Sequence, residues 1–374
     1  MTTTAFLSLE DISDNLPPYD ESVISVDMDD ALQAAYEELE EEIRSAMKEH
    51  RGNKSLMSIL LNTLLLYPDH PYDFDQIWGR ALDPQTKEYV KFLVTEPQNL
   101  TREVLYAKER ALIADIKEEL RHGRRCQVYA TYTGEKDVTL RLEAALRQAG
   151  FRVAVLRSSV ATDKREQWYE RQLAAGVEVV ICHPKLVETG LDLLAFPTLY
   201  FYETGYSLHT LRQAGRRSWR IGQRFPVRVK FLTYKFTMQE TCLRLMGKKM
   251  LVALTLEGKF SGEGLQALDT DEDLMSAMAR ELVEKAGVGQ SADAVWRELD
   301  HEREKVQPRH AAVQPEFEGE SAPVLDLPVV LAAEQAPTPF GIHLIEPDLP
   351  SKRRKKNTLW PTATETNVQL SLFD

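Results

Sequence analysis

The sequence predicts an α/β fold in which a parallel sheet is covered by helices on both faces. Two observations carry this prediction. Between about residues 102 and 234, short apolar segments alternate with longer segments of helical periodicity. The apolar segments are nearly continuous, as expected of strands that are buried on both faces. We therefore expect repeated strand–helix units whose parallel strands end at one common edge.

The predicted elements follow one another along the central part of the chain. The segment 137–149 is the clearest helix, because its apolar residues form one stripe. Ligands of such sheets bind at the carboxyl ends of the strands, so polar residues that follow a strand are candidates for a site. The expected series is helix 103–122, strand 126–132, helix 137–149, strand 151–156, helix 163–175, strands 177–182 and 198–202, an arginine-bearing helix, and strand 227–234.

Helical sections flank this central part. A short strand at 22–28 and helices near 30–47 and 55–66 precede it, and helices at about 271–286 and 291–305 follow it. Residues 301–374 contain nine of the eighteen prolines, which predicts a disordered tail. The expected organisation is a helical connector at 1–100, the sheet domain at 101–258, a helical extension at 259–305 and the tail at 306–374.

Composition narrows the class of protein. The apolar run Leu56–Tyr67 is too short to cross a bilayer, and no signal peptide opens the chain, so we expect a cytoplasmic protein without a membrane partner. The three cysteines have no metal-ligand spacing, and we expect no metal site of their own. The net charge is −12, yet residues 212–249 carry eleven Lys and Arg against the single acid Glu240. A basic section of this kind can bind a polyanion locally.

The most informative segment is Gln213–Gln223, with the sequence QAGRRSWRIGQ. Gln213, Arg217 and Arg220 are spaced i, i+4 and i+7, which predicts one shared helix face. Two guanidinium groups on one face suit phosphate oxygens, although any arginine-rich helix offers a solvated basic face. The segment resembles motif VI of superfamily-2 helicases, in the form used by Swi/Snf-type DNA-dependent ATPases.

The resemblance implies a RecA-like fold for the sheet domain. It also implies that Arg217 and Arg220 reach across a cleft to the phosphates of an ATP, with its Mg²⁺, held mainly by an opposite N-terminal lobe. Gln213 would belong to the same ATP site.

A second segment, Ile181–Leu193, resembles motif V of the same family. The resemblance implies that Thr189 contacts the DNA backbone and that Gly190 lets the backbone approach phosphates. Asp192 would bind the nucleotide sugar or couple to the arginine helix. A loop glycine and a helix-capping aspartate remain the simpler reading.

The segment Thr131–Glu135, which follows a predicted strand, resembles motif IV. The resemblance implies that Thr131 and Thr133 hold a DNA backbone without reading its sequence. Threonines in a strand-to-helix turn also serve as helix caps, so this alternative stays open. His183 and His209 are interpreted as structural polar residues.

The sequence departs from the complete family pattern. A full motor needs a glycine-rich phosphate loop ending in Lys-Ser or Lys-Thr and an acidic box for Mg²⁺, and neither is found here. We therefore expect one lobe of a two-lobe motor, inactive in ATP hydrolysis until an N-terminal lobe is supplied by a separate chain or a longer parent. The closest resemblance is to helicase-like proteins of phages, prophages and plasmids.

The last residues suggest a further partner. Gln369, Leu370, Leu372 and Phe373 resemble the peptide by which bacterial DNA polymerases and repair proteins dock on the sliding clamp. A flexible tail would present this peptide and raise the local concentration of whatever it tethers. The run Lys352–Lys356 is either a phosphate-binding patch or a solvated charge run.

Two rival functions remain open. The first is a non-catalytic DNA-binding adaptor that is recruited to the clamp, and the second is an RNA-directed helicase. The form of the arginine segment favours the DNA-acting branch by resemblance. Translocation on duplex DNA and strand separation are not distinguished by the sequence.

Overall fold

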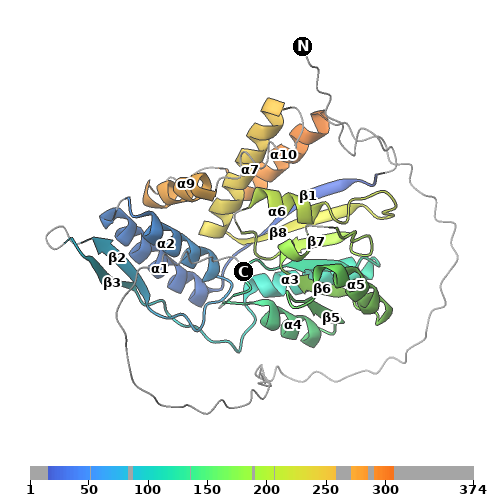
Figure 1. The fold of residues 1–374 in the computed structure, drawn as a ribbon, viewed down its shortest axis with the longest axis horizontal. Helices are drawn as coiled ribbons and strands as arrows, with labels where there is room; N and C mark the ends of the chain where they lie inside the picture. Colours follow the sequence, from blue (N-terminus) through green and yellow to red (C-terminus); the bar gives the residue numbers. More distant parts are fainter. Residues whose placement is uncertain are drawn as a thin grey trace. The chain divides into compact units, whose positions relative to one another are not determined.

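A computed structural model describes residues 16–50, 52–82, 87–134, 136–187, 190–205, 207–257, 271–284 and 290–306. In this part of the chain, six parallel strands form one sheet in the order β1-β8-β7-β4-β6-β5. Two antiparallel strands, β2 and β3, form a separate hairpin (Figure 1). The pairing of the strands confirms the predicted α/β fold with a parallel sheet.

The predicted helices and strands of the central part are present with ends shifted by a few residues, except that the predicted arginine-bearing helix ends at Gly215, before Arg217 and Arg220. The bounds are β1 Tyr19–Val26, α1 Asp30–Glu49, α2 Lys54–Leu66, β2 Ile77–Leu82, β3 Tyr89–Thr95, α3 Ala107–Arg121, β4 Cys126–Tyr129, α4 Thr139–Gln148, β5 Val153–Leu156, α5 Arg165–Ala174, β6 Val179–Cys182, β7 Thr198–Phe201, α6 Leu208–Gly215, β8 Val227–Tyr234, α7 Met238–Glu257, α9 Asp271–Glu284 and α10 Ala292–Val306.

Helices cover both faces of the parallel sheet, which explains why its strands are apolar throughout. Every residue of β4, β6 and β7 is buried. One face packs against α3 and α4, through Leu112 and Leu142 among others. The other face packs against α5, α6 and α7, through residues such as Leu211 and Leu243. None of the described helices is long and apolar enough to cross a membrane.

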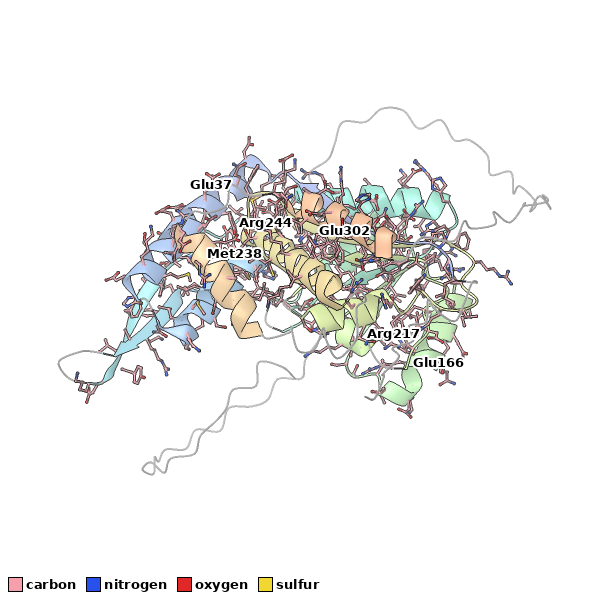
Figure 2. The ribbon with its side chains drawn as sticks, turned by 90° about the horizontal axis from the view of Figure 1, so that it is seen from above. Glu37, Glu166, Arg217, Met238, Arg244 and Glu302 are labelled. Atoms are coloured by element: carbon pink, nitrogen blue, oxygen red, sulfur yellow. The ribbon has the colours of Figure 1, made fainter. Side chains whose placement is uncertain are left out.

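Strand β1 belongs to the parallel sheet, although its residues fall within the predicted connector 1–100. It pairs with β8 over its whole length, from Tyr19 opposite Val227 to Val26 opposite Tyr234. Helix α10 contacts both β1 and α7. Figure 2 shows α7, which begins at Met238, beside α10, which carries Glu302. The indole of Trp296 in α10 donates to the carbonyl of Leu243 at 3.1 Å.

The hairpin β2–β3 was not predicted from the sequence. Its inner face packs on the connector helices, and Gly79 allows the ring of Phe92 to lie close to the backbone. A Cβ atom at position 79 would lie 2.5 Å from that ring. A glycine inside a short strand weakens the strand signal, which explains why the pattern was missed.

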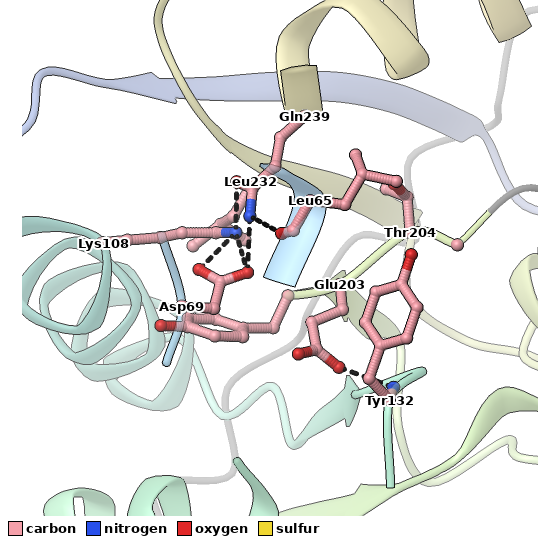
Figure 3. Close-up of a pocket in the computed structure, with 10 residues that line it drawn as sticks. Leu65, Asp69, Lys108, Tyr132, Glu203, Thr204, Leu232 and Gln239 are labelled. Atoms are coloured by element: carbon pink, nitrogen blue, oxygen red, sulfur yellow. Dashed lines mark hydrogen bonds and ion pairs between the residues drawn. The ribbon is translucent and has the colours of Figure 1, made fainter. Parts of the chain in front are cut away.

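A buried ion pair joins the connector to the sheet domain (Figure 3). The ammonium group of Lys108, in α3, donates to both carboxylate oxygens of Asp69 at 2.9 and 3.0 Å. It also donates to the side-chain carbonyl of Gln239, in α7, at 3.0 Å. The Gln239 amide donates in turn to Asp69 at 2.7 Å and to the carbonyl of Leu65 at 2.9 Å. All three side chains are buried, so this cluster fixes α2, α3 and α7 to one another.

Replacing Lys108 by Met should leave the Asp69 carboxylate buried without its cation. Breaking a buried pair in this way costs roughly 3–5 kcal/mol, so the free energy of unfolding should fall by about that amount in urea denaturation. The matched control is Arg110→Ala, which removes the exposed pair between Arg110 and Asp29. The control should cost less than about 1 kcal/mol. Equal losses in the two variants would contradict a structural role for the buried pair.

Candidate functional site

A tight turn follows β4 at the carboxyl edge of the parallel sheet. The backbone N–H groups of Thr131 and Tyr132 donate to one carboxylate oxygen of Glu203 at 2.8 and 2.9 Å. The Thr131 hydroxyl donates to the backbone carbonyl of Glu203 at 2.8 Å. The Thr131 hydroxyl therefore donates its proton to an intramolecular hydrogen bond, whereas the side chain of Thr133 is exposed. Of the two predicted DNA contacts at this turn, Thr133 is the more exposed.

Glu203 was not singled out in the sequence, yet it organises this turn. Burial raises its pKa to about 8 and the nearby Asp69 carboxylate adds to the rise, while the two N–H donors oppose it. A cavity of about 10 Å³, lined by Asp69, Lys108, Tyr132 and Glu203 among others, lies beside it (Figure 3). This space is close to that of a single water molecule. An acid directly after the predicted apolar strand 198–202 was the available sequence signal.

His183, which follows β6, has a structural role consistent with its interpretation. Its ring nitrogen accepts from the backbone N–H of Lys185 at 3.0 Å. Burial lowers its pKa to about 4, the Lys185 charge lowers it further, and a hydrogen bond with the backbone of Thr131 opposes the change. The ring is therefore neutral near pH 7.

The predicted helix face through Gln213, Arg217 and Arg220 is wrong. Helix α6 ends at Gly215, so the two arginines lie in the turns that follow it (Arg217 is labelled in Figure 2). A Cβ atom at position 215 would lie 3.2 Å from the Tyr19 hydroxyl, so the helix end is packed closely against β1. Tertiary contacts outweigh the helical spacing of the three residues here.

Three side chains hold the arginine segment, residues 216–223, in this non-helical path. The Ser218 hydroxyl donates to the carbonyl of Phe196 at 2.7 Å, and the Trp219 indole donates to the carbonyl of Pro17 at 2.7 Å. The Gln223 amide donates to the carbonyls of Leu194 and Ser218 at 3.0 and 3.1 Å. All three side chains are buried.

The position of the arginine segment also differs from expectation. Its partners Pro17 and Phe196 precede β1 and β7, so the segment is fixed near the amino ends of these strands. The sequence predicts that the polar groups of the site lie at the carboxyl ends of the strands. Thr131 and Glu203 do lie at that edge, but the arginine segment does not. The loop after β6 leads toward the segment, because Leu193 donates its N–H to the carbonyl of Arg217 at 2.9 Å.

The structure brings together two pairs of predicted site residues. Arg217 donates to the side-chain carbonyl of Gln213 at 3.2 Å. Arg220 lies 3.4 Å from the Asp192 carboxylate, with exposed side-chain fractions of 36% and 66%. A pair whose carboxylate is this exposed contributes little free energy.

Of the two other predicted site residues in the loop after β6, the structure describes Gly190 but not Thr189. Gly190 has a positive φ of 73°, and nothing lies within 4 Å of where its Cβ would be. The backbone conformation therefore favours glycine there, whereas the space around it would admit a side chain. Thr189 lies outside the described residues, as do the tail residues Gln369, Leu370, Leu372 and Phe373.

A buried charge cluster beside the arginine segment was missed in the sequence. Glu21, in β1, accepts from Arg212 of α6 at 2.9 Å and from Arg303 of α10 at 2.7 Å. Tyr19 donates its hydroxyl to the same carboxylate at 2.6 Å. Burial alone would raise the pKa of Glu21, but the two guanidinium groups outweigh it and lower the pKa to about 2. The partners lie 191 and 282 residues away along the chain, so no local pattern could reveal them.

The chain is similar to known helicase-type proteins. No protein-family model matches it. It is 24% identical over 295 residues to a chromodomain-helicase-DNA-binding protein 1-like of Danio rerio, which covers 72% of this chain and 27% of that protein. The chain thus spans about a quarter of the length of this relative.

Two solved structures are also similar to the chain. One is the C-terminal part of the Fun30 ATPase domain, with a TM-score of 0.46, 14% identity, and coverage of 72% of this chain and 99% of that one. The other is the Sulfolobus solfataricus SWI2/SNF2 ATPase core in complex with double-stranded DNA, with a TM-score of 0.45, 16% identity, and coverage of 73% and 50%.

Glu203→Gln should change how stability depends on pH. The Glu203 pKa is about 8 in the folded chain against an ordinary value of 4.5, so between these values the folded state holds a proton that the unfolded state releases. The free energy of unfolding of the parent protein should therefore fall, relative to that of the variant, as pH rises from about 5 to 8. The amide oxygen of the variant can still accept hydrogen bonds from both N–H groups. Urea denaturation of the two proteins at several pH values measures the difference.

The exposed Glu166→Gln variant controls for the loss of a carboxylate as such. A difference between the parent protein and Glu203→Gln that stays constant from pH 5 to 8 would contradict the protonated, buried Glu203.

Proposed function

We propose that this chain supplies the second lobe of an ATP-dependent motor that acts on DNA. The observation that carries the proposal is the arginine segment, in which Arg220 is partly exposed on a buried, hydrogen-bonded support beside Asp192. The sequence likeness to a helicase-DNA-binding protein and the basic stretch at 212–249 support it. The exposed Thr133 at the carboxyl edge supports a contact with the DNA backbone.

In this proposal the nucleotide and its Mg²⁺ are held mainly by a phosphate-loop lobe from another chain or another part of a longer protein. ATP hydrolysis would supply the free energy for movement along DNA. The residues of this chain fit a triphosphate, since the ion-pair partner that Arg220 has among the described residues is the mostly exposed Asp192 carboxylate, a weak contact to give up. Arg220 would turn from Asp192 toward the phosphates and neutralise the charge that develops there. Arg217, oriented by Gln213, would add a second positive charge.

The same geometry offers a route from the nucleotide to DNA. The carbonyl of Arg217 accepts from Leu193, which follows Gly190 and Asp192 in the loop after β6. In the proposal, Thr189 of this loop contacts the DNA backbone. A shift of the arginine segment on nucleotide binding would therefore move the loop that holds DNA, because a backbone hydrogen bond joins the two.

The test is DNA-stimulated ATP hydrolysis by this chain mixed with a phosphate-loop lobe, such as one encoded next to it. Hydrolysis should appear only in the mixture. Arg220→Ala should lower the rate on the order of 10³-fold, as loss of an arginine finger does in comparable enzymes. Arg224→Ala is the matched control, because Arg224 is an exposed arginine four residues further on. Equal rates for the two variants would refute the assigned role of Arg220.

The C-terminal peptide supports a second candidate function, that of a DNA-binding adaptor recruited to the bacterial sliding clamp. Leu370, Leu372 and Phe373 would fill an apolar pocket of the clamp, while Gln369 would orient the peptide by hydrogen bonds. Clamp and DNA binding without ATP hydrolysis, whichever lobe is added, would favour the adaptor over the motor. An origin in a phage, prophage or plasmid remains a prediction.

Deleting residues 369–373 should abolish binding to a purified bacterial clamp, since the apolar side chains that fill the pocket are lost. Surface plasmon resonance against an immobilised clamp measures this directly. The control exchanges Thr362 and Thr364 for Ala, which keeps the terminal peptide. Clamp binding that survives the deletion would exclude the docking role.

A further inference from the structure

The outer face of the hairpin β2–β3 combines exposed aromatic and cationic side chains. Residues directly opposite each other in an antiparallel pair lie on one face. Trp78 is opposite Leu93, and Arg80 is opposite Lys91. Tyr89 is on the same face, two residues before Lys91. We call these five residues, Trp78, Arg80, Tyr89, Lys91 and Leu93, the outer hairpin face.

All five side chains are exposed to solvent. The exposed fractions are 40% for Trp78, 46% for Leu93 and 75% for Tyr89, while Arg80 and Lys91 are also exposed. The inner face is packed instead, with Phe92 against Gly79 and His50. Trp78 and Tyr89 lie on the opposite face of the hairpin, so packing against the connector helices does not explain these aromatic residues. Exposed apolar groups gathered on one surface are typical of binding sites.

The charge on this face has one sign. Two cations lie on it, and neither β2 nor β3 contains an acidic residue. The Lys91 ammonium lies 4.6 Å from the centre of the Trp78 ring. An anionic partner is therefore favoured over a cationic or purely apolar one.

The alternation of aromatic and cationic side chains on the outer hairpin face indicates which class of anionic partner would bind there. Along each strand, the side chains of the face recur every second residue, roughly 6.8 Å apart. Single-stranded nucleic acid presents bases to aromatic rings and phosphates to cations, and its unpaired bases are free to stack. Duplex DNA keeps its bases stacked internally, so it would use the cations but leave the rings exposed. The rings favour the single strand.

We propose that the outer hairpin face binds single-stranded DNA, with Trp78 and Tyr89 stacking on bases and with Arg80 and Lys91 contacting phosphates. This surface lies on the connector hairpin, apart from the arginine segment and the turn after β4. It goes beyond the proposed function, because it assigns the chain a contact with an unpaired strand. Its test uses this chain alone, so the result does not depend on whether an added lobe confers ATP hydrolysis.

The experiment measures fluorescence anisotropy of a labelled oligo(dT) and of a labelled duplex at several salt concentrations. Trp78→Ala/Tyr89→Ala should weaken oligo(dT) binding tenfold or more, with little change in the salt dependence and little effect on the duplex. Arg80→Ala/Lys91→Ala should weaken oligo(dT) binding and lower the slope of log affinity against log salt by about 1.4, or 0.7 for each lost phosphate contact.

The matched control is Lys164→Ala/Arg171→Ala, which removes two exposed cations at α5. It should bind oligo(dT) within twofold of the parent protein. Thermal unfolding of each variant checks that the exposed substitutions leave the fold intact. The proposal is overturned if the hairpin variants bind oligo(dT) as the parent protein does. It is also overturned if the aromatic variant loses duplex binding as strongly as single-strand binding, or if the control loses as much as the hairpin variants.

Discussion

The buried ion pair between Lys108 and Asp69 is the contact on which the arrangement of the described part depends. It lies where the connector, α3 and α7 meet, and Gln239 forms a hydrogen bond with each of the two charged groups. Taking an ammonium and a carboxylate out of water is costly, and the cost is recovered only while the geometry is kept. A small displacement of any of the three elements would leave a charge unpaired. The cluster thus favours one arrangement of these elements over others, and Glu203 is placed beside it by the same packing.

In the candidate site, backbone segments that are fixed by buried hydrogen bonds carry side chains that are partly or fully exposed. Ser218, Trp219 and Gln223 fix the backbone of the arginine segment with buried hydrogen bonds, whereas Arg220 has one exposed carboxylate near it. At the carboxyl edge, Glu203 fixes the turn through two N–H groups, whereas Thr133 is exposed. This arrangement keeps the conformational entropy that is lost on ligand binding low, because the backbone is already ordered before the ligand binds.

Local sequence patterns predicted much of the fold and less of the site. Apolar periodicity located the helices and strands between residues 102 and 234, because each pattern reports burial of its own segment. The membership of β1 in the sheet, the end of α6 at Gly215 and the pairing of Glu21 with Arg303 depend on contacts far along the chain. The spacing of Gln213, Arg217 and Arg220 fitted a helix, yet Trp219 and Ser218 have better partners outside one. Patterns within a segment do not contain that information.

The place of β1 in the sheet has a consequence for how the chain folds as it is synthesised. This strand is synthesised about two hundred residues before its partner β8, and the guanidinium group of Arg303 comes 282 residues after Glu21. Contacts between such distant segments form slowly, since a long loop must close first. Until then Glu21 remains hydrated and β1 has no neighbour. Among the described strands, β1 is therefore one of the last to be paired, and a nascent chain that stalls before α10 would leave Glu21 without the guanidinium group of Arg303.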